Sequence, residues 1–262
     1  HVSGMSVAEL DEEERWYDLV HDPEYVVRLA RRYNDRSETI VGRRLLNERD
    51  PDPGRQWPAV KGLHAIFEGE NRWEGHSYWL EQVAHTPDEL AALLDRVEER
   101  LQNVRAFLLP DRWEEEKARL TALGCRVPLY RSQRGPVTFA MSIYGVENLI
   151  FLLMDDPDLA DRFSALIRKA ILERARVLDE EAGFKPADAP RGFYWFDDNC
   201  AMLNAEMYER FAYPILQGVF DRYSPSPGDR RGQHSDSDMA HILPLLGRLG
   251  MTTVNLGPNL TV

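Results

Sequence analysis

Strand-like and helix-like segments alternate along most of this chain, and this alternation constrains the fold more than any other feature. Short runs rich in β-branched and aromatic residues are followed by longer runs with apolar side chains every three or four positions. The clearest of the segments that we predict as strands are residues 60–67, 127–130, 192–196 and 252–256. Strands that alternate with helices predict parallel βαβ units.

The helices are indicated by their ends as well as by their periodicity. A helical pattern over residues 6–34 is broken at Asp22-Pro23, and a hydroxyl at Thr86 before Pro87 is a typical helix start. The longest helix begins after Asp156 and ends at Gly183. Further helices are predicted over residues 87–122, 205–223 and 242–249, with a kink at Pro214.

The order of these elements favours one fold class. No glycine-rich phosphate motif follows a predicted strand, so a dinucleotide-binding fold has no local support. We expect an α/β protein, a (β/α)8 TIM barrel with N-terminal helices, as a single domain over residues 5–262. Only about five or six strands can be found where a closed barrel has eight. We therefore expect the last βα units to lie beyond Val262.

Composition excludes several classes of partner. The chain has 44 acidic and 32 basic residues and a net charge of −12, which argues against nucleic acid and against an anionic membrane surface. No apolar run approaches the ~20 residues that span a bilayer. The two cysteines, Cys125 and Cys200, form no zinc-binding or disulfide pattern. We expect a cytoplasmic protein that acts on a small-molecule substrate.

An acidic pair follows the strand over residues 192–196. Asp197 and Asp198 would repel each other there, which raises one pKa and suits acid–base catalysis. Trp195 before the pair and Asn199 after it are candidate substrate contacts. The alternative is that one Asp caps the next turn and the other faces solvent. At the mouth of a barrel, where strand ends line the active site, we favour the catalytic interpretation for Asp198 and Asp197.

A second polar segment contains His234-Ser235-Asp236. In an extended segment, the side chains of His234 and Asp236 point to the same face. Imidazole and carboxylate are both zinc ligands, so the two residues are candidate ligands of zinc or another divalent metal. The alternative is that Ser235, Asp236 or Ser237 caps the helix that follows. Arg131 and Ser132, near another predicted strand end, are candidate substrate-binding residues, with an ordinary ion pair as the alternative for Arg131.

Together these segments resemble the uroporphyrinogen decarboxylase superfamily, which also contains corrinoid-linked, zinc-dependent methyltransferases. The resemblance covers about residues 84–262 and rests on the order and spacing of several short motifs. These are Thr86-Pro87-Asp88-Glu89-Leu90, Gly135-Pro136-Val137-Thr138-Phe139-Ala140, Gly145 with Glu147, Asp156-Pro157-Asp158-Leu159, Asp197-Asp198-Asn199 with Tyr208, Phe211 and Pro214, and His234-Ser235-Asp236 with Ile242-Leu243-Pro244 and Gly250. The resemblance implies a (β/α)8 barrel.

In the methyltransferase branch, a His-x-Cys pair supplies zinc ligands and the zinc activates a thiol methyl acceptor. His234 matches the histidine, but Asp236 occupies the cysteine position and is a harder ligand. In the decarboxylase branch, an N-terminal Arg-Gln-Ala-Gly-Arg motif binds substrate carboxylates, and this chain lacks it.

Three functions follow from the resemblance. The first is a metal-dependent methyltransferase that uses a corrinoid as methyl donor or acceptor, with a corrinoid protein as partner. The second is a metal-free decarboxylase of a porphyrinogen or a smaller carboxylated substrate. The third is a non-catalytic barrel that binds a corrinoid or a partner protein. A homodimer is compatible with each of them.

Overall fold

A computed structural model describes residues 15–48 and 57–257 of the chain. The chain divides into two compact units. The first comprises residues 1–57, 72–79 and 116–125, and the second comprises residues 58–71, 80–115 and 126–262. The two units are described one at a time below, and the expectation of a single barrel domain over residues 5–262 stays a prediction.

The first unit contains two helices that meet at Asp22. Helix α2 (Trp16–His21) ends there, and α3 (Pro23–Val41) begins with the Asp22 carboxylate accepting hydrogen bonds from the backbone N–H groups of Glu24 and Tyr25. The predicted break at Asp22-Pro23 is therefore confirmed, while the predicted helix before residue 15 lies outside the described residues. A hairpin of β1 (Asn71–Glu74) and β2 (Ser77–Leu80) turns at Gly75, which has a φ of 61°. Its residues 72–79 belong to the first unit, and its end residues Asn71 and Leu80 belong to the second.

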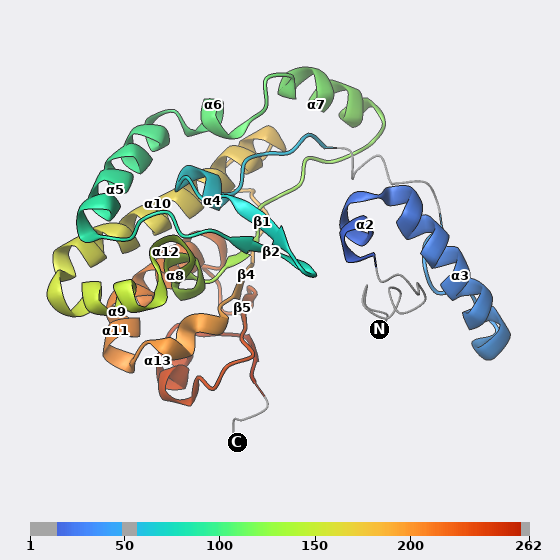
Figure 1. The fold of residues 1–262 in the computed structure, drawn as a ribbon. Helices are drawn as coiled ribbons and strands as arrows, with labels where there is room; N and C mark the ends of the chain where they lie inside the picture. Colours follow the sequence, from blue (N-terminus) through green and yellow to red (C-terminus); the bar gives the residue numbers. More distant parts are fainter. Residues whose placement is uncertain (1–14, 49–56, 258–262) are drawn as a thin grey trace. The chain divides into compact units, whose positions relative to one another are not determined.

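The second unit is built on a parallel sheet (Figure 1). Its strands are β3 (Ser132–Arg134), β4 (Phe193–Phe196), β5 (Arg231–His234) and β6 (Thr253–Asn255), hydrogen-bonded in this order. The predicted α/β class with a parallel sheet is confirmed. The described residues contribute four strands to this sheet, and they do not include a closed eight-stranded barrel.

Two of the predicted strands are correct and two are misplaced. The predictions at residues 192–196 and 252–256 correspond to β4 and β6. Residues 60–67 instead contain the short helix α4 (Leu63–Ile66), because a brief apolar run has no period that separates strand from helix. The strand predicted at residues 127–130 begins later, as β3.

Most of the helices belong to the second unit. They are α4, α5 (Pro87–Gln102), α6 (Val104–Leu108), α8 (Pro136–Tyr144), α9 (Val146–Asp155), α10 (Pro157–Glu181), α11 (Ala205–Phe211), α12 (Tyr213–Tyr223) and α13 (Leu243–Arg248). The unit also contains the 3-10 turns η2 (Asp198–Met202) and η3 (Ala240–Ile242). Helix α7 (Trp113–Ala122) has residues in both units. The predicted start of α5 is confirmed, because the Thr86 hydroxyl accepts a hydrogen bond from Glu89 N. Pro214 lies in the first turn of α12, where its missing N–H costs nothing.

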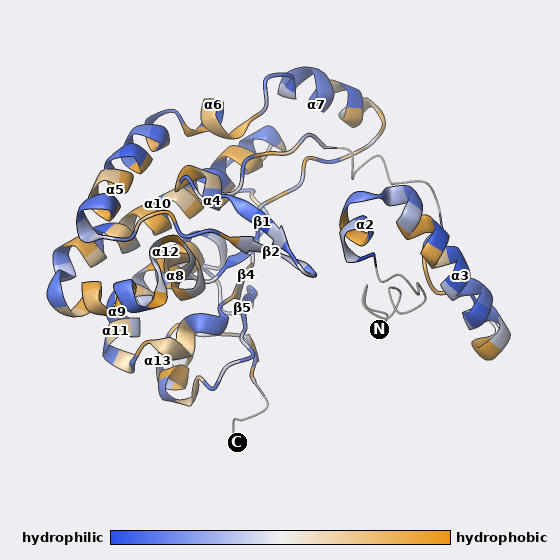
Figure 2. Ribbon diagram, in the orientation of Figure 1, coloured by the Kyte–Doolittle hydropathy of each residue, from blue (hydrophilic) through white to orange (hydrophobic). Residues whose placement is uncertain are grey.

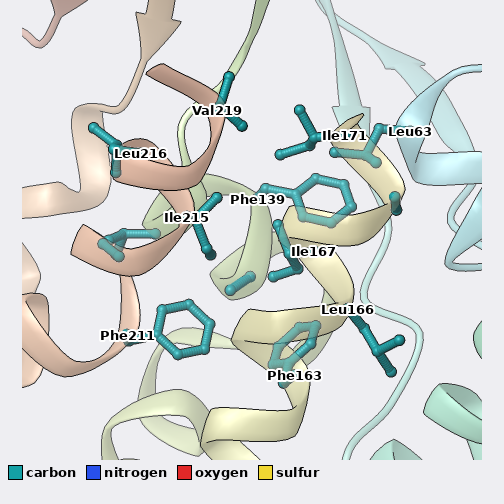
Figure 3. Close-up of a cluster of buried hydrophobic side chains, with 14 of the residues drawn as sticks. Leu63, Phe139, Phe163, Leu166, Ile167, Ile171, Phe211, Ile215, Leu216 and Val219 are labelled. Carbon is teal, nitrogen blue, oxygen red and sulfur yellow. The ribbon is translucent and has the colours of Figure 1, made fainter. Parts of the chain in front are cut away.

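The long helix α10 organises the hydrophobic core. It packs against α5, α9 and α12. Figure 3 shows Phe163 and Ile167 of α10 facing Phe211 and Ile215, with Phe139 of α8 nearby. All five side chains are completely or almost completely buried, and burial of each large apolar side chain stabilises the fold by roughly 1.5–3 kcal/mol. Figure 2 shows the contrast between hydrophobic α8 and the largely hydrophilic α7.

The apolar segment after Gly135-Pro136 forms two consecutive helices, α8 and α9, which meet at Gly145 with a φ of 94°. Within the part of the chain that the structure describes, no single helix has both the length and the apolar character needed to cross a membrane. Helices α8 and α9 satisfy that criterion only as a pair, and the pair is bent by 101°.

Candidate metal centre at the carboxyl edge of the sheet

The carboxyl ends of the strands bring several polar side chains to one edge of the sheet. Four residues lie in register and form one row across the sheet. In order they are Arg134 of β3, Phe196 of β4, His234 of β5 and Asn255 of β6. Residues in register on parallel strands point to the same face of a sheet. Phe196 is 46% exposed, and its ring centroid lies 6.1 Å from that of His234.

Three ligand-type side chains converge beside this row. One potential ligand atom from each of Asp198, His234 and Asp236 lies within 4.8 Å of the other two. His234 Nε2 is 3.6 Å from Asp236 Oδ2, and the side chains are 33% and 73% exposed. Tetrahedral zinc with bonds of 2.0–2.2 Å separates its ligand atoms by about 3.4 Å. The 3.6 Å between His234 and Asp236 is close to this value, and Asp198 lies within 4.8 Å of both, so the three residues are candidate ligands of one divalent ion.

The backbone helps to hold this cluster. The backbone N–H of Asp236 donates to Asp198 Oδ1 at 2.9 Å, which orients the Asp198 carboxylate toward the His234 segment. Asp198 opens the 3-10 turn η2, directly after β4. Hydrogen bonds that orient a ligand commonly tune the metal site as well. The two segments that the sequence singled out are thus adjacent in space.

Asp197 has a different environment from that of Asp198. It is completely buried, its Oδ1 accepts from the backbone N–H of Thr138 at 2.8 Å, and its own N–H donates to the His234 carbonyl. Burial raises the pKa of Asp197 to about 6, the negative Asp198 adds to the rise, and the donors at the start of α8 oppose it. Among the described residues, Asp197 Oδ2 has no hydrogen-bond partner. Asp197 therefore joins α8 to the sheet and carries a proton more readily than an exposed aspartate.

The approach of β3 to Asp197 depends on a glycine. A Cβ added to Gly135 would lie 2.1 Å from Asp197 Cβ and 2.2 Å from its Cγ. Gly135 N also donates to the Phe196 carbonyl at 2.7 Å. Asn199, predicted to contact substrate, is half-buried, and its backbone N–H donates to the Thr138 hydroxyl at 3.0 Å.

The thiol nearest this cluster faces the interior. Cys200 is buried, and its sulfur lies 3.6 Å from Ser235 Oγ and 3.8 Å from Met239 Sδ. Burial, followed by the charge of Asp197, raises the pKa of Cys200 to about 12. Because a metal binds the thiolate form, Cys200 is poorly suited to be a ligand in this arrangement.

Three other predicted site residues lie away from the cluster. The Arg131 guanidinium forms an ion pair with the buried carboxylate of Asp179 and also donates to the carbonyl groups of Tyr130 and Pro190. Trp195 is completely buried and contacts Phe193 and Phe220 on the face opposite Phe196. Ser132 is exposed at the start of β3, the end of the strand opposite Arg134.

Arg134 was not among the residues selected from the sequence, and Gly135 and Thr138 were named only as members of the family motif over residues 135–140, with no role at the site. Arg134 ends β3 and directly precedes Gly135-Pro136, so a basic residue just before a Gly-Pro turn was the available signal. The roles of Gly135 and Thr138 depend on contacts with Asp197 and Asn199, about 60 residues later in the chain. No local pattern reports such contacts.

Comparison with known proteins identifies the family. The profile of uroporphyrinogen decarboxylase (URO-D) matches residues 116–262, which is more than half of the chain. The chain therefore belongs to the uroporphyrinogen decarboxylase family. This agrees with the resemblance noted in the sequence.

The other comparisons add little detail. A solved structure of a methyltransferase from Methanosarcina mazei is similar, with a TM-score of 0.45 and 14% sequence identity over 87% of this chain. The matched region spans 62% of that methyltransferase. No curated protein matches the chain.

Proposed function

We propose that this protein is a metal-dependent methyltransferase within the uroporphyrinogen decarboxylase family, with zinc or another divalent ion held by Asp198, His234 and Asp236. The observation that carries the proposal is the convergence of these three ligand atoms within 4.8 Å at the carboxyl edge of a parallel sheet. In open α/β sheets and in barrels, this edge is where ligands bind. When bound, such an ion supplies Lewis acidity that lowers the pKa of a coordinated thiol.

The residues around the cluster have distinct tasks in this proposal. His234 would supply a nitrogen ligand and the two carboxylates would supply oxygen ligands, a harder set than one with thiolates. Asp236, whose side chain is 73% exposed, leaves access from solvent. Phe196 offers an apolar surface beside His234, suited to a methyl group or to the edge of a corrinoid. Asp197, with a pKa of about 6, can hold a proton beneath the site.

The experiment is a methyl-transfer assay with methylcobalamin as donor and a small thiol as acceptor, with and without added zinc. We expect zinc-dependent thioether formation by the wild type and a loss of at least tenfold in His234→Ala. The matched control is His85→Ala, which removes an exposed histidine outside the cluster. Absence of methyl transfer, or activity that is equal in His234→Ala and the wild type, would contradict the proposal. Metal-independent release of carbon dioxide from a carboxylated substrate would favour the decarboxylase alternative.

A further inference from the structure

A small cationic cavity lies beside the first strand of the sheet, within the second unit. It has a volume of about 190 Å³ and is bordered by Arg134 at the end of β3, Arg174 of α10 and His64 of α4. Tyr130 and Asn71 complete the lining used in this argument. Sites for drug-sized ligands are usually about 300–1,000 Å³. The cavity is therefore large enough for one charged substituent but too small for a macrocycle.

The cavity concentrates positive charge without a counter-charge. No carboxylate borders it, and within residues 15–48 and 57–257 neither Arg134 nor Arg174 forms an ion pair. This is unexpected in a chain with 44 acidic and 32 basic residues, where carboxylates are plentiful. Both arginines are half-buried, and cations that are partly withdrawn from water are normally paired, because the loss of hydration is costly.

The side chains are held in place by neutral groups. Arg134 Nη1 donates to Ser142 Oγ at 3.1 Å, and Arg174 Nε donates to the carbonyl of Lys61 at 2.9 Å. The Arg174 guanidinium also lies 4.2 Å from the centroid of the Tyr130 ring. A guanidinium has five N–H donors, and these two hydrogen bonds use one on each arginine. Both arginines therefore keep donors for a ligand.

His64 is positioned by the backbone below it. A Cβ on Gly62 would lie 2.5 Å from His64 Cε1 and 2.6 Å from Nδ1, so the imidazole packs directly against the backbone of Gly62. Its Nε2 lies 3.3 Å from Asn71 Nδ2. Burial, and then the charges of Arg134 and Arg174, lower the pKa of His64. A negative charge bound among these groups would oppose the lowering of the His64 pKa by the two arginines.

We propose that this cavity binds an oxyanion, a carboxylate or phosphate group, through Arg134, Arg174 and His64. Phe196 of β4 is in register with Arg134 on the neighbouring strand β3 and with His234 on the other neighbouring strand β5. The Cα atoms of Arg134 and His234 are therefore two strand spacings, about 10 Å, apart. We assign the oxyanion to one end of a small substrate whose reacting end lies at the candidate metal centre, an assignment that rests on the proposed function. The cavity itself does not require the metal.

Isothermal titration calorimetry tests this proposal, with sodium phosphate and sodium succinate as separate probes at constant ionic strength in sodium chloride. We expect at least one probe to bind the wild type and Arg134→Gln and Arg174→Gln to weaken binding at least tenfold. Arg126→Gln, which removes an exposed arginine from the same stretch of chain, should bind within twofold of the wild type. Binding of phosphate alone indicates a phosphorylated substrate, and binding of succinate alone indicates a carboxylated one.

Two further measurements keep the test independent of folding and of the metal. In the wild type, the ring signals of His64 in NMR spectra should shift upon saturation with the bound anion. Arg134→Lys keeps the positive charge but should bind the anion more weakly than the wild type. His234→Ala should lose metal but retain the anion, so failure of the metal centre is distinguishable from failure of the cavity. Absence of binding by both probes, or unchanged affinity in both glutamine variants, would overturn the proposal, as would loss of the anion in His234→Ala.

Discussion

The contact between Gly135 and Asp197 gives a sharp prediction about how the sheet edge is built. In Gly135→Ala, the new Cβ would lie 2.1 Å from Asp197 Cβ, whereas carbon atoms in contact are normally about 3.5–4.0 Å apart. The backbone of Gly135 has φ −60° and ψ 160°, which alanine adopts freely, so the clash is the only cost. Asp197 cannot move easily, because its carboxylate and its N–H are both hydrogen-bonded in the interior.

Relief of this overlap requires a shift of more than 1 Å between β3 and β4, and we expect a loss of about 3 kcal/mol, the upper part of the range for overpacking. Urea unfolding followed by circular dichroism measures the change, and the melting temperature should fall by about 10 °C. Gly228→Ala is the matched control, since nothing lies within 4 Å of its added Cβ. A Gly135→Ala variant with a free energy of unfolding within 0.5 kcal/mol of the wild type would refute this packing argument.

Two further predictions concern charged groups in the second unit. Hydrogen bonds from Arg96 and Arg100 of α5 lower the pKa of Glu68 to about 2. Because this folded-state pKa lies below the ordinary value, the stabilisation is complete above about pH 5 and is lost as the pH falls toward 2. After allowance for solvent exposure, Glu68→Gln should cost about 1–2 kcal/mol at pH 7 and less than half as much at pH 3, by urea unfolding at each pH. A cost that is the same at both pH values would be inconsistent with this origin. Asp179→Asn removes the buried negative charge that pairs with Arg131 and should lower the free energy of unfolding by about 3 kcal/mol in the same assay. Asp161→Asn, which breaks the exposed ion pair with Arg210, should lower it by less than about 1 kcal/mol. Equal effects of the two substitutions would show that burial of the Arg131 pair contributes nothing.

The elements with strong local signals could be predicted from the sequence. The helix start at Thr86 and the long helix α10 are determined by capping groups and by apolar periodicity within a few residues of each other. The strand β4 is a compact aromatic run whose alternate residues, Phe193 and Trp195, face the core. In each case local propensity and tertiary packing favour the same structure.

Other features depend on contacts that no local pattern contains. The hairpin of β1 and β2 is mostly exposed and has no apolar alternation, so its residues resemble a loop. The apolar run that forms α8 is buried almost all round, which removes the period that would indicate a helix. Pro136 at the first helical position was the remaining signal.

The candidate site shows the same division. His234 and Asp236 could be selected because they alternate on one strand end, and the Asp pair could be selected because it follows another. Asp198 lies beside His234 and Asp236, whereas Asp197 is buried in the interior. This difference depends on how β4 ends beside β5. The cationic cavity combines residues from three separated segments, around positions 64, 134 and 174, and no spacing rule connects them.

Zinc binding by the purified chain, measured by equilibrium dialysis with elemental analysis, tests whether Asp198, His234 and Asp236 form a metal centre. We expect one zinc per chain in the wild type, and an affinity at least tenfold lower in both His234→Ala and Asp236→Asn. Asp238→Asn, from the same acidic segment but outside the cluster, should bind as the wild type does. Equal zinc binding by the wild type and by both cluster variants would contradict the assignment of the metal centre.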